Sequence, residues 1–189
     1  MKKILSQFIS KSFPYTGKEL STQYIYRYFD LLGDAIIAFI GPCKVNLSEM
    51  VDLEDVKTQS PIYSENMLHF LVEHFGESLE KMVLRQRLLI TLCLETFREF
   101  GVHSLNRKGD DLYHGDSKLS VSIATVSPLS ALIHTGINIS SKNTPVQTRG
   151  LEDYQINPQA FAERVLKKYV EEMEDVFLAS CKVRSVSGS

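Results

Sequence analysis

The stretch Gly109 to Ser140, GDDLYHGDSKLSVSIATVSPLSALIHTGINIS, predicts three antiparallel strands that face a ligand. Apolar and polar residues alternate along it, as they do in half-buried strands. Because successive side chains of a strand point to opposite faces, the segment 118–124 has an apolar face and a small polar face. The apolar face, expected to be core, carries Leu119, Val121 and Ile123. The small polar face, expected to meet the ligand, carries Lys118, Ser120, Ser122 and Ala124.

The segment 132–140 repeats this division. Its predicted core face carries Ile133, Thr135, Ile137 and Ile139. Its predicted ligand face carries Leu132, His134, Gly136, Asn138 and Ser140. A glycine within a strand lets a ligand or another backbone approach closely, so Gly136 is a candidate for contact with the ligand.

The rest of the chain predicts helices and strands around this sheet. Strands are expected at 3–13, at 34–40 before Gly41-Pro42, and at 102–106 and 111–114. Helices are expected at 19–32, at 64–75 with Ser64 as N-cap, at 78–100, and from Asn157-Pro158 onward, with a short helix or loop at 50–60. This pattern predicts one α+β domain over 1–189, mainly antiparallel, whose last strand at 182–189 frays from about 185.

Composition limits the classes of partner. The net charge is −2, with 21 basic and 23 acidic residues, so neither nucleic acid nor an anionic membrane is an expected partner. The three cysteines are widely spaced, which is typical of reduced thiols, and there is no apolar run that could span a bilayer. We therefore expect a cytoplasmic protein with a small-molecule ligand.

Lys118 is the first candidate for a functional residue. It begins a strand whose same-face neighbours are serines, where a compact ammonium can hold a phosphate or polarise an acyl oxygen. The competing interpretation is a solvated lysine after a turn. Asp111 shares a strand face with Tyr113 and could orient Lys118.

The acidic hairpin next to Lys118 has two interpretations. Asp110, Asp111, His114 and Asp116 lie within seven residues and could in principle hold a divalent metal ion. Aspartate is also favoured in turns for its local geometry, and this is the preferred interpretation, so no metal is predicted.

Two further polar candidates are weaker. Cys43 follows Gly41-Pro42 and could present a thiol nucleophile, but a small buried thiol is the commoner state of such a residue. His134 could act as a base, although a single histidine more often makes only structural hydrogen bonds. His69 and His74 are five apart on a predicted helix and are not expected to act together.

The same residues carry a family resemblance. Together with SEMVDLEDV, PIYSENMLHF, LRQRLL and GLEDY, the stretch RKGDDLYHGDSKLSVSIATVSPLSALIHTGINIS resembles an uncharacterised prokaryotic family known as domain of unknown function 366. The resemblance runs from about Tyr15 to Arg184. It implies no activity.

A more distant resemblance concerns biotin and lipoate protein ligases. The order Asp111-Leu-Tyr113, a turn, Lys118-Leu-Ser120 and Gly136-Ile-Asn138-Ile is similar to theirs. It implies the class II aminoacyl-tRNA synthetase and biotin synthetase fold, an antiparallel-rich sheet flanked by helices. In those enzymes the residue matched by Lys118 contacts the acyl carbonyl and phosphate, and Asp111, Gly136 and Asn138 match its neighbours.

The chain departs from that pattern in its phosphate-binding loop. The resemblance implies ATP and Mg²⁺ as cofactors, but nothing here matches the arginine- and glycine-rich loop of the ligases. The nearest glycine-containing loop, Phe39 to Cys43, has no arginine. Related octanoyl transferases use a cysteine with the lysine and no ATP, which would give Cys43 a role.

The sequence therefore favours a ligase- or acyltransferase-like enzyme for a small carboxylic acid or activated acyl group. Lys118 would stabilise negative charge, Asp111 would orient it, and the pocket would be shaped by Ser120, Ser122, His134, Gly136 and Asn138. The alternative is a noncatalytic module that binds a small molecule on the same fold. A homodimer through the helix face Tyr24 to Leu32 is a third hypothesis.

Overall fold

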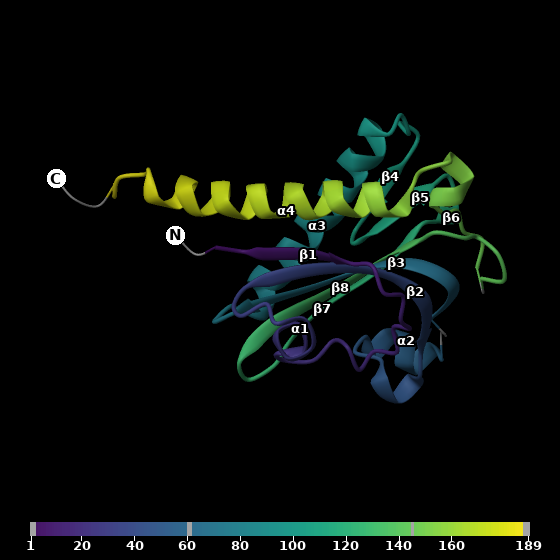
Figure 1. Cartoon of the computed structure of the whole chain (residues 1–189), viewed down its shortest axis with the longest axis horizontal. Coiled ribbons are helices and arrows are strands. Elements are labelled where there is room, and N and C mark those ends of the chain that lie inside the picture. The colour runs from purple at the N-terminus through teal and green to yellow at the C-terminus, as the bar shows by residue number, and fades with distance from the viewer. Residues whose placement is uncertain (1–2, 60–61, 145, 187–189) are drawn as a thin grey trace.

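The computed structural model describes residues 3–59, 62–144 and 146–186. A five-stranded sheet forms its centre, in the order β1-β2-β3-β8-β7 (Figure 1). These strands are β1 (Leu5–Ile9), β2 (Ala35–Val45), β3 (Ile62–Phe75), β8 (Ser130–Asn138) and β7 (Ser120–Val126). β1 runs parallel to β2, and the other neighbours are antiparallel.

A second sheet of three short strands extends one end of the first. It contains β4 (Asn106–Lys108), β5 (Asp111–His114) and β6 (Ser117–Lys118), with a turn at Gly115-Asp116 between β5 and β6. The chain crosses from β6 to β7 at Leu119, whose N–H donates to Leu112 and whose carbonyl accepts from Asn138. The strand predicted at 118–124 is thus divided between two sheets, with Lys118 in the smaller one.

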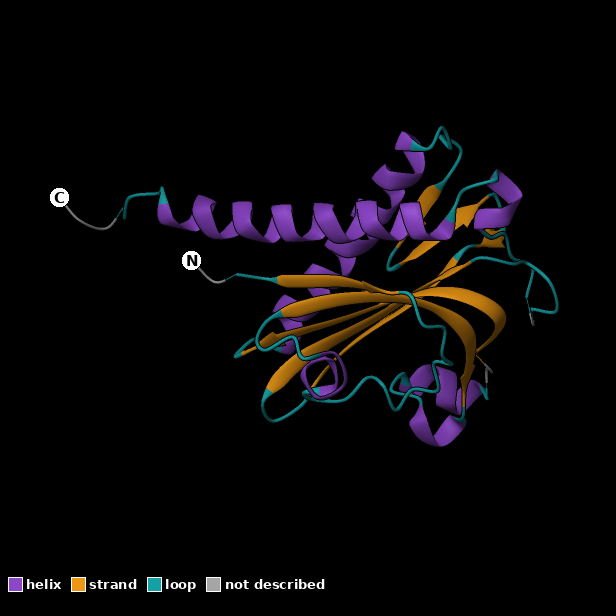
Figure 2. Ribbon diagram, viewed as in Figure 1, coloured by secondary structure: helices purple, strands orange, loops and turns teal. Residues whose placement is uncertain are grey.

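Helices flank the large sheet on both faces (Figure 2). The long helices α3 (Leu79–Glu99) and α4 (Pro158–Cys181) cover one face, and the short helices α1 (Tyr24–Phe29) and α2 (Leu53–Thr58) lie on the other. Two 3₁₀ turns, η1 (Leu47–Glu49) and η2 (Leu151–Tyr154), complete the elements. The predicted architecture, an antiparallel-rich α+β sheet flanked by helices, is confirmed.

Local capping explains where the two long helices begin. The Ser78 hydroxyl accepts from the N–H of Lys81, and the Asn157 side chain accepts from the N–H of Ala160. Pro158 occupies the first turn of α4, where its missing N–H costs nothing. Both predicted starts are confirmed, and α3 ends at Glu99, within two residues of the predicted end.

Two hydrophobic cores lie on opposite faces of the large sheet. The core under α3 and α4 is the larger one, and it includes Leu68, Phe70, Ile133, Phe97 and Tyr169. The smaller core lies under the segment before β2, and it includes Tyr15, Ile25, Phe39, Met67 and Leu71. Alternate residues of β2 and β3 therefore serve different cores, so these two strands are apolar on both faces.

The helix predicted at 64–75 is wrong. This segment is β3, the central strand, and Ser64 is not a helix cap. Met67, Leu68, Leu71, Val72 and Phe75 fit helical spacing, but a strand buried on both faces carries apolar residues on either face, so periodicity cannot distinguish the two. Its fourteen residues pair with β2 on one side and β8 on the other.

Other boundaries differ because tertiary contacts override local signals. β2 does not stop at Gly41-Pro42 but continues to Val45, since a bulge between Gly41 and Cys43 accommodates the proline. The first helix spans only Tyr24–Phe29, and the strand predicted at 102–106 begins only at Asn106. The described part of the tail, 182–186, contains no strand, and 187–189 lie outside the described residues.

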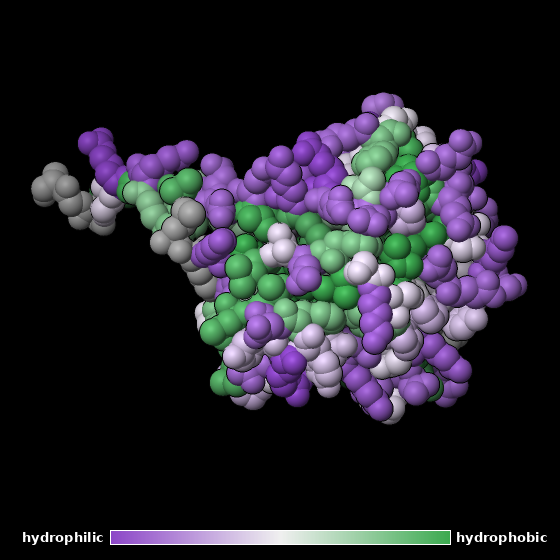
Figure 3. Space-filling view, viewed as in Figure 1, coloured by the Kyte–Doolittle hydropathy of each residue, from purple (hydrophilic) through white to green (hydrophobic). Residues whose placement is uncertain are grey.

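The molecular surface shows polar side chains along the outer face of α4 and an apolar area beneath it, at the level of β1 (Figure 3). On the face predicted to dimerise, Tyr28 and Leu32 are 65% and 70% exposed, but a homodimer remains a prediction. Among the described residues, no helix combines the length and the apolar character needed to cross a membrane.

Gly41→Ala is expected to destabilise the fold by about 2–3 kcal/mol, because overpacking of a tight site costs energy of this order. A Cβ at this position would overlap the backbone carbonyl of Phe13, which lies directly over β2 and cannot rotate away as a side chain could. Urea unfolding of the two proteins at neutral pH measures the difference. A loss below about 1 kcal/mol would mean that the Phe13 segment shifts freely.

Candidate functional site

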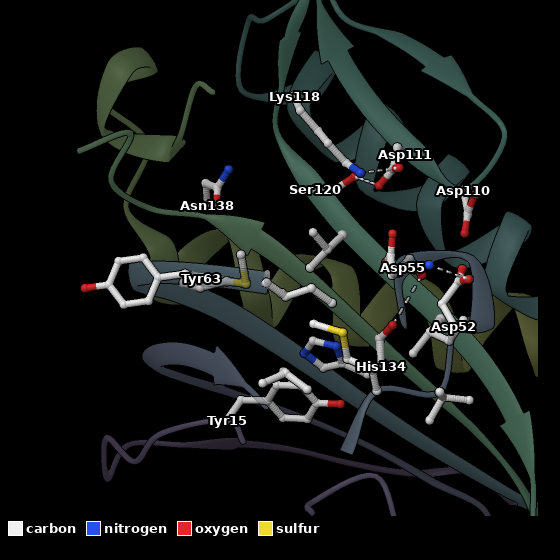
Figure 4. Close-up of a pocket in the computed structure, with 18 of the residues that line it drawn as sticks. Tyr15, Asp52, Asp55, Tyr63, Asp110, Asp111, Lys118, Ser120, His134 and Asn138 are labelled. Carbon is white, nitrogen blue, oxygen red and sulfur yellow. Dashed lines mark hydrogen bonds and ion pairs between the residues drawn. The ribbon is translucent and has the colours of Figure 1, made fainter. Parts of the chain in front are cut away.

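A cavity of about 420 Å³ opens on the face of the large sheet that carries α1 and α2. Its floor comes from β3, β7 and β8, and one side comes from the β5–β6 hairpin (Figure 4). Further walls are formed by the segment from Glu49 to Asp55, which includes the start of α2, and by Thr144, Val146 and Thr148. Most of the predicted site residues therefore meet at one cavity.

Lys118 and Asp111 form an ion pair on the hairpin side of this cavity. The distance from Lys118 Nζ to Asp111 Oδ2 is 2.8 Å, and the two side chains are 32% and 17% exposed. Burial alone would lower the pKa of Lys118, but the Asp111 carboxylate outweighs it and the pKa is raised. Lys118 is thus a permanently charged ammonium beside the cavity.

The Asp111 carboxyl is itself perturbed. Burial raises its pKa, and the Lys118 ammonium offsets only part of that rise. The Ser120 hydroxyl donates to Asp111 Oδ1 at 3.2 Å and accepts from the N–H of Leu112 at 2.8 Å. Asp111 is therefore held between a charge and a hydroxyl, in a position to orient Lys118.

The backbone of Lys118 is fixed from the opposite side. Its N–H donates to the carbonyl of Gln147, and its carbonyl accepts from the N–H of Arg149. These two bonds tie the cavity loop 146–149 to β6 as a parallel bridge centred on Thr148. Because β5 pairs with the other edge of β6, the position of Lys118 depends on three chain segments.

The cavity is acidic. Its described lining includes one cationic side chain, Lys118, and five carboxylates, which belong to Glu49, Asp52, Asp55, Asp110 and Asp111. The formal charge of this lining is 1 − 5 = −4. Burial, and then the charge of Asp52, raise the pKa of Asp55. A polyanionic ligand would meet repulsion here without a bound cation.

The Asp110 carboxylate contacts two side chains of the helix α3. Gln86 of α3 donates to its Oδ2 at 3.0 Å, and Arg87 Nη1 lies 3.5 Å from its Oδ1. His114 faces away from the cavity and bonds to the hydroxyl of Tyr154 at 2.8 Å. Within the described residues, no group of three or more histidines, cysteines or carboxylates is arranged to hold a metal ion.

His134 lies on the side of the cavity opposite Lys118 and forms a buried pair with His69 (Figure 4). His69 Nδ1 and His134 Nε2 are 3.0 Å apart, and His69 Nε2 lies 3.2 Å from the carbonyl oxygen of Gly41. The Tyr15 ring stacks on His134, with centroids 3.6 Å apart. Burial lowers the pKa of His69 to about 3 and lowers that of His134 well below its usual value, so both rings are neutral.

The prediction that Ser120 and Ser122 share a sheet face with His134 is wrong. Val121 lies opposite Gly136 and Ile123 lies opposite His134, whereas Ser122 lies opposite Thr135. Directly opposed residues of antiparallel strands point to the same face. The two serines border the cavity, but their side chains belong to the α3 side of the sheet, where Ser122 bonds to Gln86 and Thr135.

Gly136 and Asn138 lie on the predicted face of β8. A Cβ at Gly136 would overlap the sulfur of Met67, so the glycine makes room for a methionine that lines the cavity. Asn138 is 5% exposed and borders the cavity directly. The predicted close approach at Gly136 is therefore made by a protein side chain.

Cys43 is fully buried in the smaller core and does not line the cavity. Burial, reinforced by Glu19, raises the pKa of its thiol to about 12. The thiolate needed for nucleophilic attack is therefore scarce at neutral pH.

Several cavity residues escaped prediction from the sequence. Asp52 and Asp55 belong to the segment predicted only as a short helix or loop, and Tyr15 was not named as a candidate. His69, which bonds to the cavity residue His134, lies in the segment that was predicted as a helix. The sequence signal for His69 was its alternation with Met67 and Leu71, which identifies a strand face once the helix is rejected. His74 points to the other face, where it contacts Asp34 and Tyr169 at 2.8 and 2.9 Å.

Comparison with known families and proteins identifies two levels of similarity. Residues 4–184 match the family described as "Domain of unknown function (DUF366)". An uncharacterised protein of Methanocaldococcus jannaschii is 41% identical over 155 residues, which cover 79% of this chain and 70% of that protein. A protein of unknown function from Pyrococcus horikoshi has a solved structure with a TM-score of 0.93 and 37% identity, over 98% of this chain and 100% of that one.

More distant solved structures share the fold. A lipoate-protein ligase A bound with ATP matches with a TM-score of 0.57 and 13% identity, over 90% of this chain and 86% of that one. A biotin acetyl coenzyme A carboxylase synthetase from Helicobacter pylori, with bound biotinylated ATP, matches with a TM-score of 0.56 and 18% identity, over 88% and 74%. At these identities the likeness is one of fold.

Proposed function

The chain belongs to the DUF366 family, which carries no assigned activity, and we propose from its cavity that it binds a small carboxylic acid or activated acyl group. In this proposal the protein is a ligase- or acyltransferase-like enzyme. The observation that carries it is the Lys118–Asp111 pair, 2.8 Å apart, fixed beside the cavity.

The walls and the charge suit the two ends of such a ligand. Apolar side chains that line the cavity would hold an acyl chain, and they include Val51, Ile62, Met67, Val121 and Ile123. The Lys118 ammonium would donate to the acyl oxygen and stabilise the negative charge that develops on it during nucleophilic attack. Asp111 would hold the ammonium in place. A ligand with one acyl oxygen at Lys118 and an apolar body fits this arrangement.

The same cavity also supports a second candidate, a noncatalytic binding module. Lys118 is the one cation among the described lining residues, against five carboxylates, and this set does not suit the phosphates of ATP. Cys43 offers no covalent alternative, because its thiol is buried outside the cavity.

A ligand panel tests the proposal. The protein is heated with biotin, lipoate, octanoate, octanoyl thioesters and amino acids, each with and without ATP and Mg²⁺. A ligand at about a hundred times its dissociation constant should raise the melting temperature by roughly 5–10 °C for a chain of this size. Pyrophosphate exchange or thioester consumption with the same ligand then separates the enzyme from the binding module.

The results of the ligand panel distinguish the two candidate functions. A shift with turnover supports the enzyme, and a shift without turnover supports the noncatalytic module. Absence of any shift with every acid and thioester would contradict both, because each requires the cavity to bind an acyl group.

A further inference from the structure

The hydrogen bonds of the two buried histidines determine which ring nitrogens carry protons. The carbonyl oxygen of Gly41 is only an acceptor, so His69 Nε2 must carry a hydrogen and donate to it across 3.2 Å. A neutral imidazole has one N–H, so His69 Nδ1 is then an acceptor. It can bond across 3.0 Å only to an N–H at His134 Nε2.

This chain of bonds reaches the cavity through His134. Because His134 Nε2 carries the one hydrogen of a neutral ring, its Nδ1 must be an unprotonated acceptor. No hydrogen bond within the described residues involves this nitrogen, although the residue is only 3% exposed. His134 Nδ1 is also not fully buried. Among the described residues, the one fully buried side-chain nitrogen or oxygen atom without a hydrogen-bond partner is Arg85 Nη1. His134 lines the cavity.

Neither a change of tautomer nor a ring flip of His134 readily turns the Nδ1 acceptor into a donor. Tyr15 stacks on His134 with an interplanar angle of 9°, and Phe39 stacks on His69 at 23°, so both rings are held in place. The opposite tautomer would place two lone pairs against each other between the rings. A flip of His134 would also break its bond to His69 inside a buried cluster.

We propose that His134 Nδ1 selects a ligand with a neutral N–H or O–H donor on the side of the cavity opposite Lys118. This inference deepens the proposed function: the acid or acyl group would carry an amide, urea or hydroxyl at its far end rather than a plain hydrocarbon tail. A donor satisfies a buried acceptor, whereas a methyl group would displace water from it and leave it unpaired.

The first experiment uses neutral fragments, so it does not depend on Lys118 or on acyl chemistry. Protein with ¹⁵N-labelled histidine is studied by NMR, which distinguishes protonated from unprotonated ring nitrogens. We expect His134 Nδ1 to be unprotonated at neutral pH and to shift on addition of 2-pyrrolidinone, but not of cyclopentanone, which has the same ring size and carbonyl without the N–H. His134→Phe assigns the signal.

A second pair of probes tests the whole ligand. Octanoate and 8-hydroxyoctanoate differ by one terminal hydroxyl, and we expect the hydroxy acid to bind roughly 10- to 100-fold more tightly to the wild type. In His134→Phe, which keeps an aromatic ring for Tyr15 to stack on, this preference should vanish. The exposed His103→Gln is the matched control and should keep it.

Failure of the inference and failure of the proposed function look different. A protonated Nδ1, or a His134 signal that the lactam does not move, overturns the inference whatever the acids do. If the lactam moves the signal but neither acid binds, the donor site stands and the acyl proposal fails. Equal binding of the two acids also overturns the inference.

Discussion

Lys118→Ala should lower turnover of the acyl substrate by about 100- to 1000-fold, the range observed when one well-placed donor to a developing oxyanion is removed. The ammonium is the one cation in the described lining of the cavity, so no other side chain there can replace it. The measurement is kcat and KM for the acid or thioester identified by the ligand panel, together with the melting temperature of each protein.

The stability of this variant should change by only about 1 kcal/mol, because the ion pair is partly exposed and its contribution is screened by solvent. Lys118→Arg should restore little of the lost turnover, since a planar guanidinium does not take the position of a compact ammonium. Lys142→Ala is the matched control, because Lys142 is an exposed lysine in the neighbouring loop. Normal turnover in Lys118→Ala, or a collapse of its stability, would make the lysine structural.

The protein should become less stable as the pH falls from 6.5 to 4.5, and His69 alone should account for about 2.3 kcal/mol of the loss. Its pKa in the folded protein is lowered to about 3, because burial disfavours the charged ring. Between about pH 3 and 6.5 the unfolded chain therefore binds a proton that folded His69 does not. The free energy of unfolding consequently decreases as the pH falls, and His134 contributes in the same direction.

Urea unfolding at pH 6.5, 5.5 and 4.5 measures this dependence. His69→Gln keeps an N–H near the Gly41 carbonyl but cannot titrate, so its stability should fall less steeply than that of the wild type. Nearby Tyr15 and Cys43 have raised pKa values, mainly because they are buried, and stay neutral throughout this interval. His103→Gln, at an exposed position, should retain the wild-type slope. Equal slopes in all three proteins would contradict a buried neutral pair.

Some of the candidate site followed directly from local sequence. The hairpin Asp111 to Lys118 is confirmed because a Gly-Asp turn between two short alternating segments determines its pairing without help from distant residues. The division of β8 into a core face and a cavity face is also confirmed, since it depends only on the two-residue period of a strand. The N-caps and the long helices α3 and α4 have the same local origin.

Other features required the register between strands. The alternation of residues 118–124 was correct, but it could not show which of its two faces meets the cavity. Pairing of Ile123 with His134 decides this, and it sends Ser122 to α3. If the pairing of β7 with β8 shifted by one residue, Ser122 would face the cavity and Ile123 would face α3. Nothing within the segment 118–124 itself determines this register.

Local sequence patterns therefore encode the hairpin with Lys118 and Asp111, the faces of β8, the two long helices and the class of fold. The assignment of 64–75 to the central strand required the three-dimensional structure, because a segment buried on both faces has no period of its own. Only that structure brought together His69, His134 and Tyr15, and the five carboxylates around Lys118. These groups are up to 119 positions apart along the chain (134 − 15), and their association depends on strand pairing and packing, which no local pattern specifies.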